Sequence, residues 1–234
     1  MMIYQQLKLG VVMIEFLLFS SFIGCSRLPI EDGWSHGNIS QVKDLFTSIF
    51  VVEYEDGVVL IDAGYDEEAK PILSYLETKN KSSSDVLAIF YTHGHRDHIA
   101  GRKTFSNAQT YGLSAERELI EEEGGTLDIE LENQNIMTFG STNIEVISVV
   151  GHTSGNAVYL VNDVLIMGDS AQSRRDGTLE PVAEKYSDNP TQAADSIEEL
   201  GIQLEPRKNE ISWTVFSHSG PLKGIDALLD YRSE

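Results

Sequence analysis

The sequence holds six histidines, and three of them fall within the segment THGHRDH at residues 92–98. His93 and His95 alternate along an extended segment, so their side chains can face one site. Asp97 and His98 come at the next bend and can reach that site from beside them. Imidazole and carboxylate groups are suitable ligands for Zn²⁺, Fe²⁺ or Mn²⁺. A polar loop without a metal is the alternative interpretation, but three histidines and an aspartate at this spacing favour a metal site.

Three further polar residues share one context, because each follows an apolar run and has glycine close by. His152 follows a run ending at residue 150, Asp169 follows residues 164–167, and His218 follows residues 213–217. Glycine permits the tight turns that bring backbone close to a metal. Each residue alone could be a helix cap or an exposed side chain. Taken together, they are expected to converge with residues 92–98 on one edge of the fold.

The elements that must position these residues are strands and helices in alternation. The apolar runs at residues 45–54 and 58–61 are joined through an Asp-Gly turn, which predicts a β-hairpin. Residues 86–92 are almost continuously apolar, as is typical of a strand buried on both faces. Further strands are predicted at residues 135–139, 143–150, 157–161, 164–167 and 213–217, and helices at 66–80, 113–123, 191–204 and 222–231. This pattern predicts an α/β sandwich of two sheets with helices outside.

The motifs THGHRDH, GHTSG, GDS and SHSG occur in this order, and the chain here resembles the metallo-β-lactamase superfamily. The resemblance implies a four-layer αββα sandwich with the metal site at one edge of the sheets. It implies one metal held by His93, His95 and His152, and a second held by Asp97, His98 and His218. Asp169 would bridge the two metals.

The resemblance also implies two divalent metal ions, with zinc favoured and iron or manganese as alternatives. Such a pair activates water for attack on an ester, thioester, lactone or amide-type carbonyl of a small-molecule substrate. Asp97 would orient the nucleophile and pass a proton to the leaving group, as the catalytic residue.

Two features of the sequence indicate which branch of the superfamily the chain resembles. Asp169 is present, and no cysteine lies near the motifs, so the pattern resembles the glyoxalase II and lactonase branch more than true β-lactamases. The short stretch after His218 leads us to expect no C-terminal helical substrate domain. The alternatives are a mononuclear iron persulfide dioxygenase, with His93, His152 and Asp169 as ligands, a true β-lactamase, and a binding module without catalysis.

Length and charge restrict the possible partners. At 234 residues, one domain is the default expectation. The chain has 37 acidic and 17 basic residues and a formal charge of −20. Nucleic-acid binding depends on neutralising phosphates with Lys and Arg, so a nucleic-acid partner is disfavoured.

The N-terminus contains an apolar run at residues 10–22 that ends close to Cys25, the single cysteine. The run suits a secretory signal peptide and is too short for a membrane span. Its end resembles a bacterial lipobox, which implies a signal peptide at residues 1–24 and a lipidated Cys25. A buried cysteine beside a core helix is the alternative. We therefore expect a short tether at residues 25–40, a domain at 41–234, and an exported protein anchored by lipid in a bacterial cell envelope.

Three further features have roles that the motifs do not assign. Asp62 stands at a strand end, where it could support a metal ligand from behind or begin a helix. His36 has no evident partner and is expected at the surface. Residues 174–188 follow Asp169 closely and are expected either to contact substrate or to form an ordinary surface connection.

Overall fold

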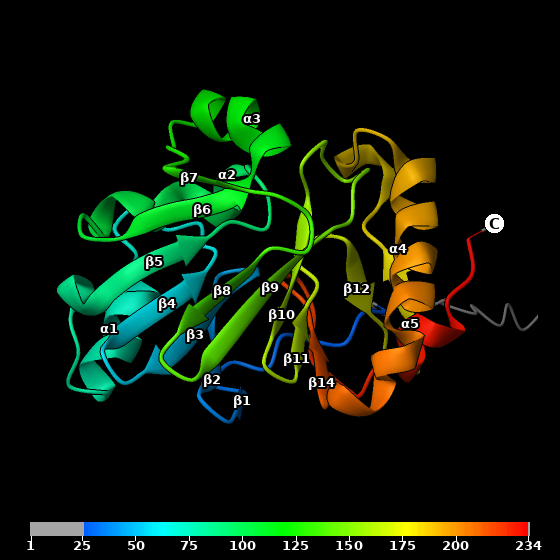
Figure 1. Ribbon diagram of the computed structural model, residues 1–234, viewed down its shortest axis with the longest axis horizontal. Helices are drawn as coiled ribbons and strands as arrows, with labels where there is room; N and C mark the ends of the chain where they lie inside the picture. The colour runs from blue at the N-terminus through cyan, green and yellow to red at the C-terminus, as the bar shows by residue number, and fades with distance from the viewer. Residues whose placement is uncertain (1–25, 234) are drawn as a thin grey trace, which may run out of the picture.

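Two β-sheets pack face to face in the computed structural model, which describes residues 26–233 (Figure 1). The first sheet has the order β1 to β7, and the second has the order β15-β14-β11-β10-β9-β8. The strands of the first sheet are β1 (Ser35–His36), β2 (Ile39–Asp44), β3 (Thr47–Tyr54), β4 (Gly57–Ile61), β5 (Val86–Phe90), β6 (Gln109–Leu113) and β7 (Ile129–Leu131). Those of the second are β8 (Ile136–Phe139), β9 (Thr142–Ser148), β10 (Ala157–Val161), β11 (Val164–Ile166), β14 (Trp213–Val215) and β15 (Leu222–Lys223). A separate hairpin pairs β12 (Ala171–Ser173) with β13 (Leu179–Pro181).

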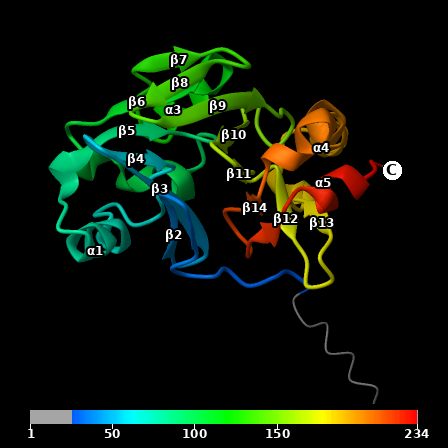
Figure 2. The same ribbon diagram turned by 60° about the horizontal axis from the view of Figure 1, so that its bottom comes forward.

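Helices cover the outer face of each sheet (Figures 1 and 2). On the first sheet these are α1 (Lys70–Thr78), α2 (Arg96–Ile99) and α3 (Arg117–Glu122), which add Ile72, Leu76, Ile99 and Ile120 to one outer core. On the second sheet, α4 (Pro190–Leu204) and α5 (Asp226–Asp230) add Ile197, Leu200, Leu204 and Leu228 to the other. The predicted four-layer αββα sandwich is confirmed.

Alternation along the strands explains why the sheets are buried on both faces. In β3, Phe50 and Val52 enter the core between the sheets, whereas Ile49 and Val51 face the helices. In β10, Tyr159 packs between the sheets and Val158 packs toward α4. Successive side chains of a strand point to opposite faces, so a run without polar residues supplies two cores at once.

Several predicted elements are confirmed, and others differ in extent. The β3–β4 hairpin forms with Tyr54 opposite Gly57, as the Asp-Gly turn indicates. The first predicted helix begins only at Lys70, because Pro71 is tolerated in a first turn and disfavoured inside a helix. The helix predicted at 222–231 is wrong in its first part, where Leu222 pairs with Thr214 in β14 and the helix follows at Asp226–Asp230.

The strands β2, β6, β7, β12 and β13 were not predicted, since they are short or hold Gln, Lys, Ser and Gly residues that do not read as strand. They form because they pair with neighbours that are already in place. β6, for example, runs parallel to β5 with Tyr111 opposite Phe90, and the two rings stack at 4.5 Å.

The folded unit includes residues before position 41. β1 and the start of β2 belong to the first sheet, and Trp34 packs between the sheets against Trp213. The predicted signal peptide and Cys25 lie outside the described residues. Within residues 26–233, no helix has both the length and the apolar character that crossing a membrane requires.

His36 lies partly exposed at the surface, but it has a partner that the sequence did not indicate. Its side chain is 34% exposed, and its Nε2 lies 2.8 Å from Oδ2 of Asp163 in the β10–β11 turn. The imidazole also lies beside the Trp213 ring, at 6.3 Å between centroids. The contact joins β1 to the second sheet, a long-range pairing that local sequence could not indicate.

Candidate metal centre

Strands that run in the same direction deliver the chemically active residues to one edge of the sandwich. β5 lies parallel to β4 and β6 in the first sheet, and β11 lies parallel to β14 in the second. The segments after β5, β9, β11 and β14 hold residues 93–98, His152, Asp169 and His218 respectively. The backbone N–H of Ala157 donates to the Thr92 carbonyl at 2.8 Å, which ties the two sheets together at this edge.

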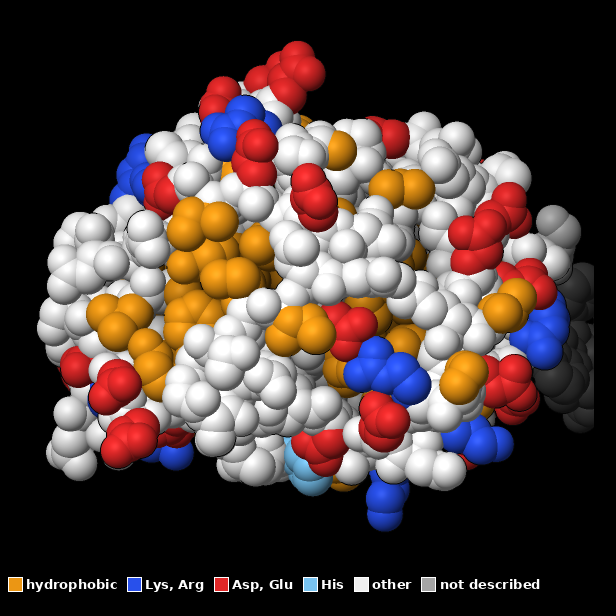
Figure 3. Space-filling view, in the orientation of Figure 1, with side chains coloured by type: hydrophobic (Ala, Val, Ile, Leu, Met, Phe, Trp, Pro, Cys, Tyr) orange, Lys and Arg blue, Asp and Glu red, His pale blue; other side chains and the backbone are white. Residues whose placement is uncertain are grey.

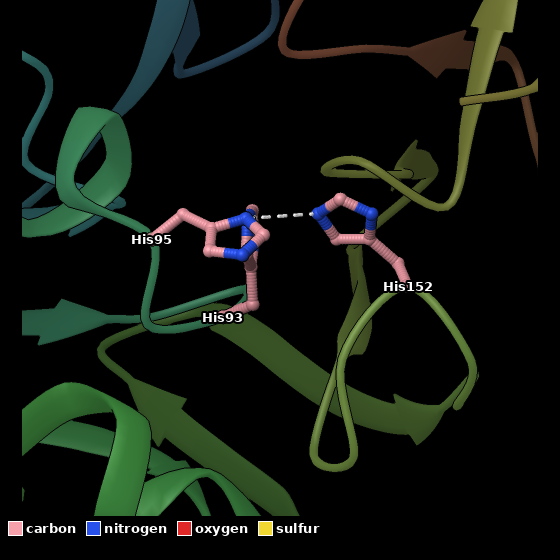
Figure 4. Close-up of side chains that lie close together, drawn as sticks. All are labelled: His93, His95 and His152. Carbon is pink, nitrogen blue, oxygen red and sulfur yellow. Dashed lines mark hydrogen bonds between the residues drawn. The ribbon is translucent and has the colours of Figure 1, made fainter. Parts of the chain in front are cut away.

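His93, His95 and His152 point their ring nitrogens at one another (Figure 4). The Nε2 of His93 lies 3.0 Å from the Nδ1 of His95, and the Nε2 of His152 lies 3.2 Å and 3.1 Å from these two nitrogens. Ligands held at the usual zinc–nitrogen distance of about 2.0–2.1 Å in a tetrahedron are separated by roughly 3.3 Å. The three nitrogens therefore fit the spacing of ligands around one metal ion.

A second group forms beside the first, from Asp97, His98 and His218. The Nε2 of His218 lies 3.3 Å from Oδ2 of Asp97, and the Nε2 of His98 lies 3.6 Å from the same oxygen. His98 is buried, and its Nε2 has no hydrogen-bond partner within residues 26–233. A buried nitrogen that lacks a partner is costly unless something else coordinates it, and a cation would do so.

Asp169 lies between the two groups. Its Oδ2 is 3.1 Å from the Nε2 of His218 and 3.7 Å from the Nε2 of His152. Its Oδ1 is 3.4 Å from the Nε2 of His98 and, within the described chain, forms no hydrogen bond. One carboxylate therefore faces nitrogens of both groups, which is the position that a bridging ligand requires.

Asp62 supports His98 from the side opposite the cluster. Its Oδ2 accepts from the Nδ1 of His98 at 2.7 Å and from the Thr92 hydroxyl at 2.8 Å, and its Oδ1 accepts the Thr92 N–H at 2.8 Å. A proton on Nδ1 leaves the lone pair of Nε2 directed at the cluster. Asp62 begins no helix, since α1 starts at Lys70, so of its two predicted roles the structure favours support of a ligand.

The imidazoles of the cluster differ in their charge at pH 7 when no metal is bound. Burial lowers the pKa of His93 well below its ordinary value and lowers that of His152 to about 4, so both rings are neutral at pH 7. Burial also disfavours the imidazolium of His218, but Asp169 and Asp97 outweigh it and raise the pKa of His218 to about 10. Without a metal, bound protons therefore balance the negative charge of the carboxylates. A divalent cation would replace these protons.

Two glycines place the ligands by letting backbone approach closely. Gly151 precedes His152 at φ +123°, and a Cβ there would lie 2.2 Å from the Ala193 nitrogen of α4. Gly168 precedes Asp169 at φ +54°, and a Cβ would lie 2.8 Å from the Cβ of Thr92. Side chains at these positions would clash and strain the backbone, so the expected role of glycine in the turns is confirmed here.

Glu116 is a functional candidate that the sequence did not indicate. This buried carboxylate accepts the Gly94 N–H at 2.8 Å through Oε1, and the Thr153 hydroxyl at 2.9 Å and the Gly155 N–H at 2.7 Å through Oε2. Gly94 lies between two histidines of the first group, and Thr153 follows the third. Glu116 thus ties both histidine-bearing loops together. It stands in an acidic helical segment with no motif spacing, so only the tertiary fold reveals it.

Phe46, at the tip of the β2–β3 hairpin, is another residue that the sequence did not single out. Its carbonyl accepts from the Nδ1 of His218 at 2.7 Å, and its ring stacks on that imidazole at 5.9 Å between centroids. The hairpin therefore orients His218 with Nε2 toward Asp97 and Asp169. No local pattern could place a hairpin tip 172 residues away from the histidine that it contacts.

A cavity of about 600 Å³ opens over the cluster, with His95, Asp97, His152, Asp169 and His218 in its floor. The segment at 174–188, predicted to contact substrate or to be a surface connection, contributes Arg175, Val182 and Tyr186 to the wall. All seven residues proposed as metal ligands thus lie around one site, five of them facing the cavity.

Metal binding at pH 7 is expected to release protons, because a ligand imidazole must be neutral and His218 is protonated when no metal is bound. Since its pKa is raised to about 10, the apparent affinity should increase as the pH rises toward that value and then level off. Calorimetric titration of zinc into metal-free protein, in two buffers with different ionisation enthalpies, measures the release. An equal heat in both buffers at pH 7 would contradict this protonation state.

Glu116→Gln is expected to weaken metal binding by about 10–100-fold, the usual effect of losing a group that orients ligands. The amide NH₂ would replace one acceptor oxygen and face an N–H or O–H donor, so one of the two loops would lose its hydrogen bonds. Competition with a chromophoric chelator measures the affinity. Glu118→Gln, in the adjoining helix α3, is the matched control, since Glu118 is exposed. Equal affinities in the two variants would show that Glu116 does not position the loops.

Known proteins of similar sequence are hydrolases by name. A hydroxyacylglutathione hydrolase from Shewanella sp. (strain ANA-3) is 27% identical over 150 residues, which cover 60% of this chain and 53% of that protein. Another, from Shewanella halifaxensis (strain HAW-EB4), is 31% identical over 163 residues, or 64% of this chain and 57% of that protein. The chain spans about half the length of the curated relatives it matches.

Solved structures share the fold over most of the chain. A metallo-beta-lactamase from Pontibacter korlensis superposes with a TM-score of 0.68 at 18% identity, covering 86% of this chain and 99% of that one. An archaeal metallo-beta-lactamase superfamily protein from Sulfolobus tokodaii gives a TM-score of 0.61 at 18% identity, covering 84% and 85%. At such identities the likeness establishes the architecture alone.

The family is established by the sequence match together with this architecture. The sequence pattern of the Metallo-beta-lactamase superfamily matches residues 42–218, a span that is more than half of the chain and includes all seven residues around the site. The family sequence pattern, the αββα layers and the residues at the sheet edge agree, and the chain belongs to the metallo-β-lactamase superfamily.

Proposed function

We propose that this protein is a metal-dependent hydrolase that uses a dinuclear site, with zinc as the favoured metal. The observation on which the proposal depends is the convergence of two ligand groups with Asp169 between them. The first group would hold one metal through His93, His95 and His152, and the second group would hold another through Asp97, His98 and His218. Five imidazoles and two carboxylates, with no thiolate, suit zinc and also accept iron or manganese.

The bound metals would supply Lewis acidity and an activated water at neutral pH. The protein's own residues then orient the reactants. Asp97 is 22% exposed and faces the cavity, so its ionised carboxylate can take up a proton from the attacking water and pass that proton to the leaving group. Burial tends to raise the pKa of Asp97, but His218 and His98 outweigh it and lower the pKa, which keeps the carboxylate ionised at pH 7.

The substrate that we propose is a small molecule with a carbonyl open to attack: an ester, thioester, lactone or amide. The curated relatives are named as hydrolases of hydroxyacylglutathione, which supports hydrolysis of an acyl bond. Since the chain spans about half of their length, this activity is carried over as a proposal.

Asp97→Asn is expected to lower kcat by at least about 10²-fold, the range associated with a positioned acid–base group. A panel of chromogenic ester, thioester, lactone and β-lactam substrates, with and without chelator, measures the activity and its metal dependence. Asp56→Asn is the matched control, because Asp56 is exposed in the β3–β4 turn and the substitution removes the same charge.

Two results would overturn this proposal. Full hydrolysis by Asp97→Asn would remove Asp97 from the reaction. Purified protein that contains one iron per chain and consumes O₂ with a persulfide would instead identify the dioxygenase, the alternative that needs only His93, His152 and Asp169 as ligands.

We also propose that Cys25 is lipidated after removal of residues 1–24 and anchors the protein in a bacterial cell envelope. The support is the apolar run before the single cysteine. The expected product is a mature chain that begins at Cys25 and carries acyl groups. Mass spectrometry of the protein from its native host measures this, with Cys25→Ser as the control. An unmodified N-terminus at Met1 would refute it.

A further inference from the structure

The segment directly after Cys25 is built into the wall of the cavity. The Leu28 N–H donates to the Ser173 carbonyl at 3.0 Å, and the Leu28 carbonyl accepts the Gly220 N–H at 2.9 Å. A Cβ at Gly220 would lie 2.4 Å from the Pro29 carbonyl oxygen. Figure 2 shows this segment, in blue, running from β2 across to the β12–β13 hairpin. It is therefore fixed against two elements that border the metal-ligand residues.

The upper walls of the cavity are mostly apolar. Leu28 and Pro29 come from the N-terminal segment, Phe46 and Tyr65 from the β2–β3 hairpin and the segment after β4, and Val182 and Tyr186 from the segment after β13. Phe46 and Tyr186 are 51% and 56% exposed, so their rings stand at the opening rather than in the core. Large exposed rings around a cavity are typical of a site that binds an apolar part of a ligand.

Arg27, Arg96 and Arg175 line this wall, and no lysine of the described residues does so. Arg96 and Arg27 differ in their carboxylate partners. Arg96 pairs with Glu67 and lies over the Tyr65 ring. Arg27 is half-buried and makes no ion pair with a carboxylate of residues 26–233. Acidic residues outnumber basic ones by 37 to 17 in this chain, so an arginine without a carboxylate partner in an apolar wall is unusual.

The chemistry of the Arg27 guanidinium indicates which kind of ligand group it would bind. It stays charged at all relevant pH values and presents donors in a planar fork that matches a carboxylate. A partly desolvated charge is stabilised when a ligand supplies the opposite charge and accepts its hydrogen bonds. The metal-ligand residues form the floor, so a ligand that spans from floor to wall needs a reactive carbonyl at one end and an anion at the other.

We propose that the substrate is an amphiphilic acyl compound, in which an apolar body joins the scissile carbonyl to a carboxylate, and that Arg27 is the residue that selects this carboxylate. The proposal rests on the hydrolase function above and deepens it. The carbonyl lies over the metal-ligand residues, the body packs on Leu28, Phe46 and Tyr186, and the carboxylate pairs with Arg27. Arg27 is a specificity residue and takes no part in bond cleavage.

Two chromogenic esters of equal length test the selection. One is the mono-4-nitrophenyl ester of heptanedioic acid, which ends in a carboxylate, and the other ends in the neutral primary amide. The full-length, zinc-loaded protein is expected to have a kcat/KM about tenfold or more higher for the carboxylate ester than for the amide ester. A charge-assisted hydrogen bond provides a preference of this size. Arg27→Gln should reduce that preference to about twofold or less by raising KM for the carboxylate ester alone.

Arg174→Gln is the matched control. Arg174 directly follows β12 and forms a β-bridge with Arg27, but its side chain pairs with Glu180 and does not line the cavity. Arg174→Gln changes the net charge by the same amount as Arg27→Gln. A general electrostatic effect would therefore lower the preference for the carboxylate ester equally in both variants. Arg27→Lys, which keeps the charge and loses the fork, should retain an intermediate preference.

The proposal is overturned if Arg27→Gln, with an unchanged melting temperature, keeps the full preference for the carboxylate ester. In that case the metal ions or another cation select the anion. It is equally overturned if Arg174→Gln loses as much preference as Arg27→Gln, since the effect would then be one of net charge.

Direct binding separates this proposal from the hydrolase function. Calorimetry with 6-phenylhexanoate and its amide, neither of which can be hydrolysed as an ester, reports on the cavity even in a protein without esterase activity. Tighter binding of the carboxylate that depends on Arg27 supports the selection, whatever the outcome of the ester assays. Equal binding of the two compounds refutes it, whether or not the esters are hydrolysed.

Discussion

The mutual proximity of buried imidazole and carboxylate groups is the constraint on which the rest of the structure depends. His93, His98, His152 and Asp169 are nearly inaccessible to water, and their polar atoms lie within a few ångströms of one another. Groups of this kind are costly to bury unless protons or a cation balance them. Without a metal, the raised pKa of His98 and His218 shows protons filling that role. A divalent cation would satisfy more of these atoms at once than protons do.

Such a cluster also needs a framework that stops its members from moving apart. Asp62 holds His98, Glu116 joins the loops of the first group, and the Phe46 carbonyl holds His218. Each of these contacts fixes which nitrogen of a histidine, or which part of a loop, faces the cluster. The supporting groups follow strands of the first sheet, whereas His218 and the loop at residues 153–155 follow strands of the second, so assembling the site requires both sheets to be in place. Folding and metal binding are therefore coupled through the same contacts.

The sequence predicted the layers, and it predicted that the histidines and aspartates of the motifs converge at one sheet edge, because both depend on local patterns. The THGHRDH spacing places four residues on one turn after a strand, and the apolar runs of β5 and β10 indicate burial on both faces. Glu116, Phe46 and the contact of His36 with Asp163 could not be predicted in this way. Their partners lie 22 to 172 residues away, and their residue types are ordinary in a helix, a hairpin or a strand. Long-range packing decides such roles, and a single sequence does not encode them in any spacing.

A protein with an acidic surface can bind an anionic substrate, because the field of the surface charges is screened over a short distance from them. Acidic side chains are spread over the face in Figure 3 rather than gathered at one place. Their field is screened over about 8 Å at physiological ionic strength. Inside the cavity the positive charges would be the divalent metals together with Arg27, Arg96 and Arg175, and the apolar walls strengthen local interactions. An anion that reaches the opening therefore meets a local positive potential although the chain as a whole carries −20. The charge of the whole protein limits which large polyanions can approach, whereas the few groups around the metal-ligand residues determine which small molecule stays.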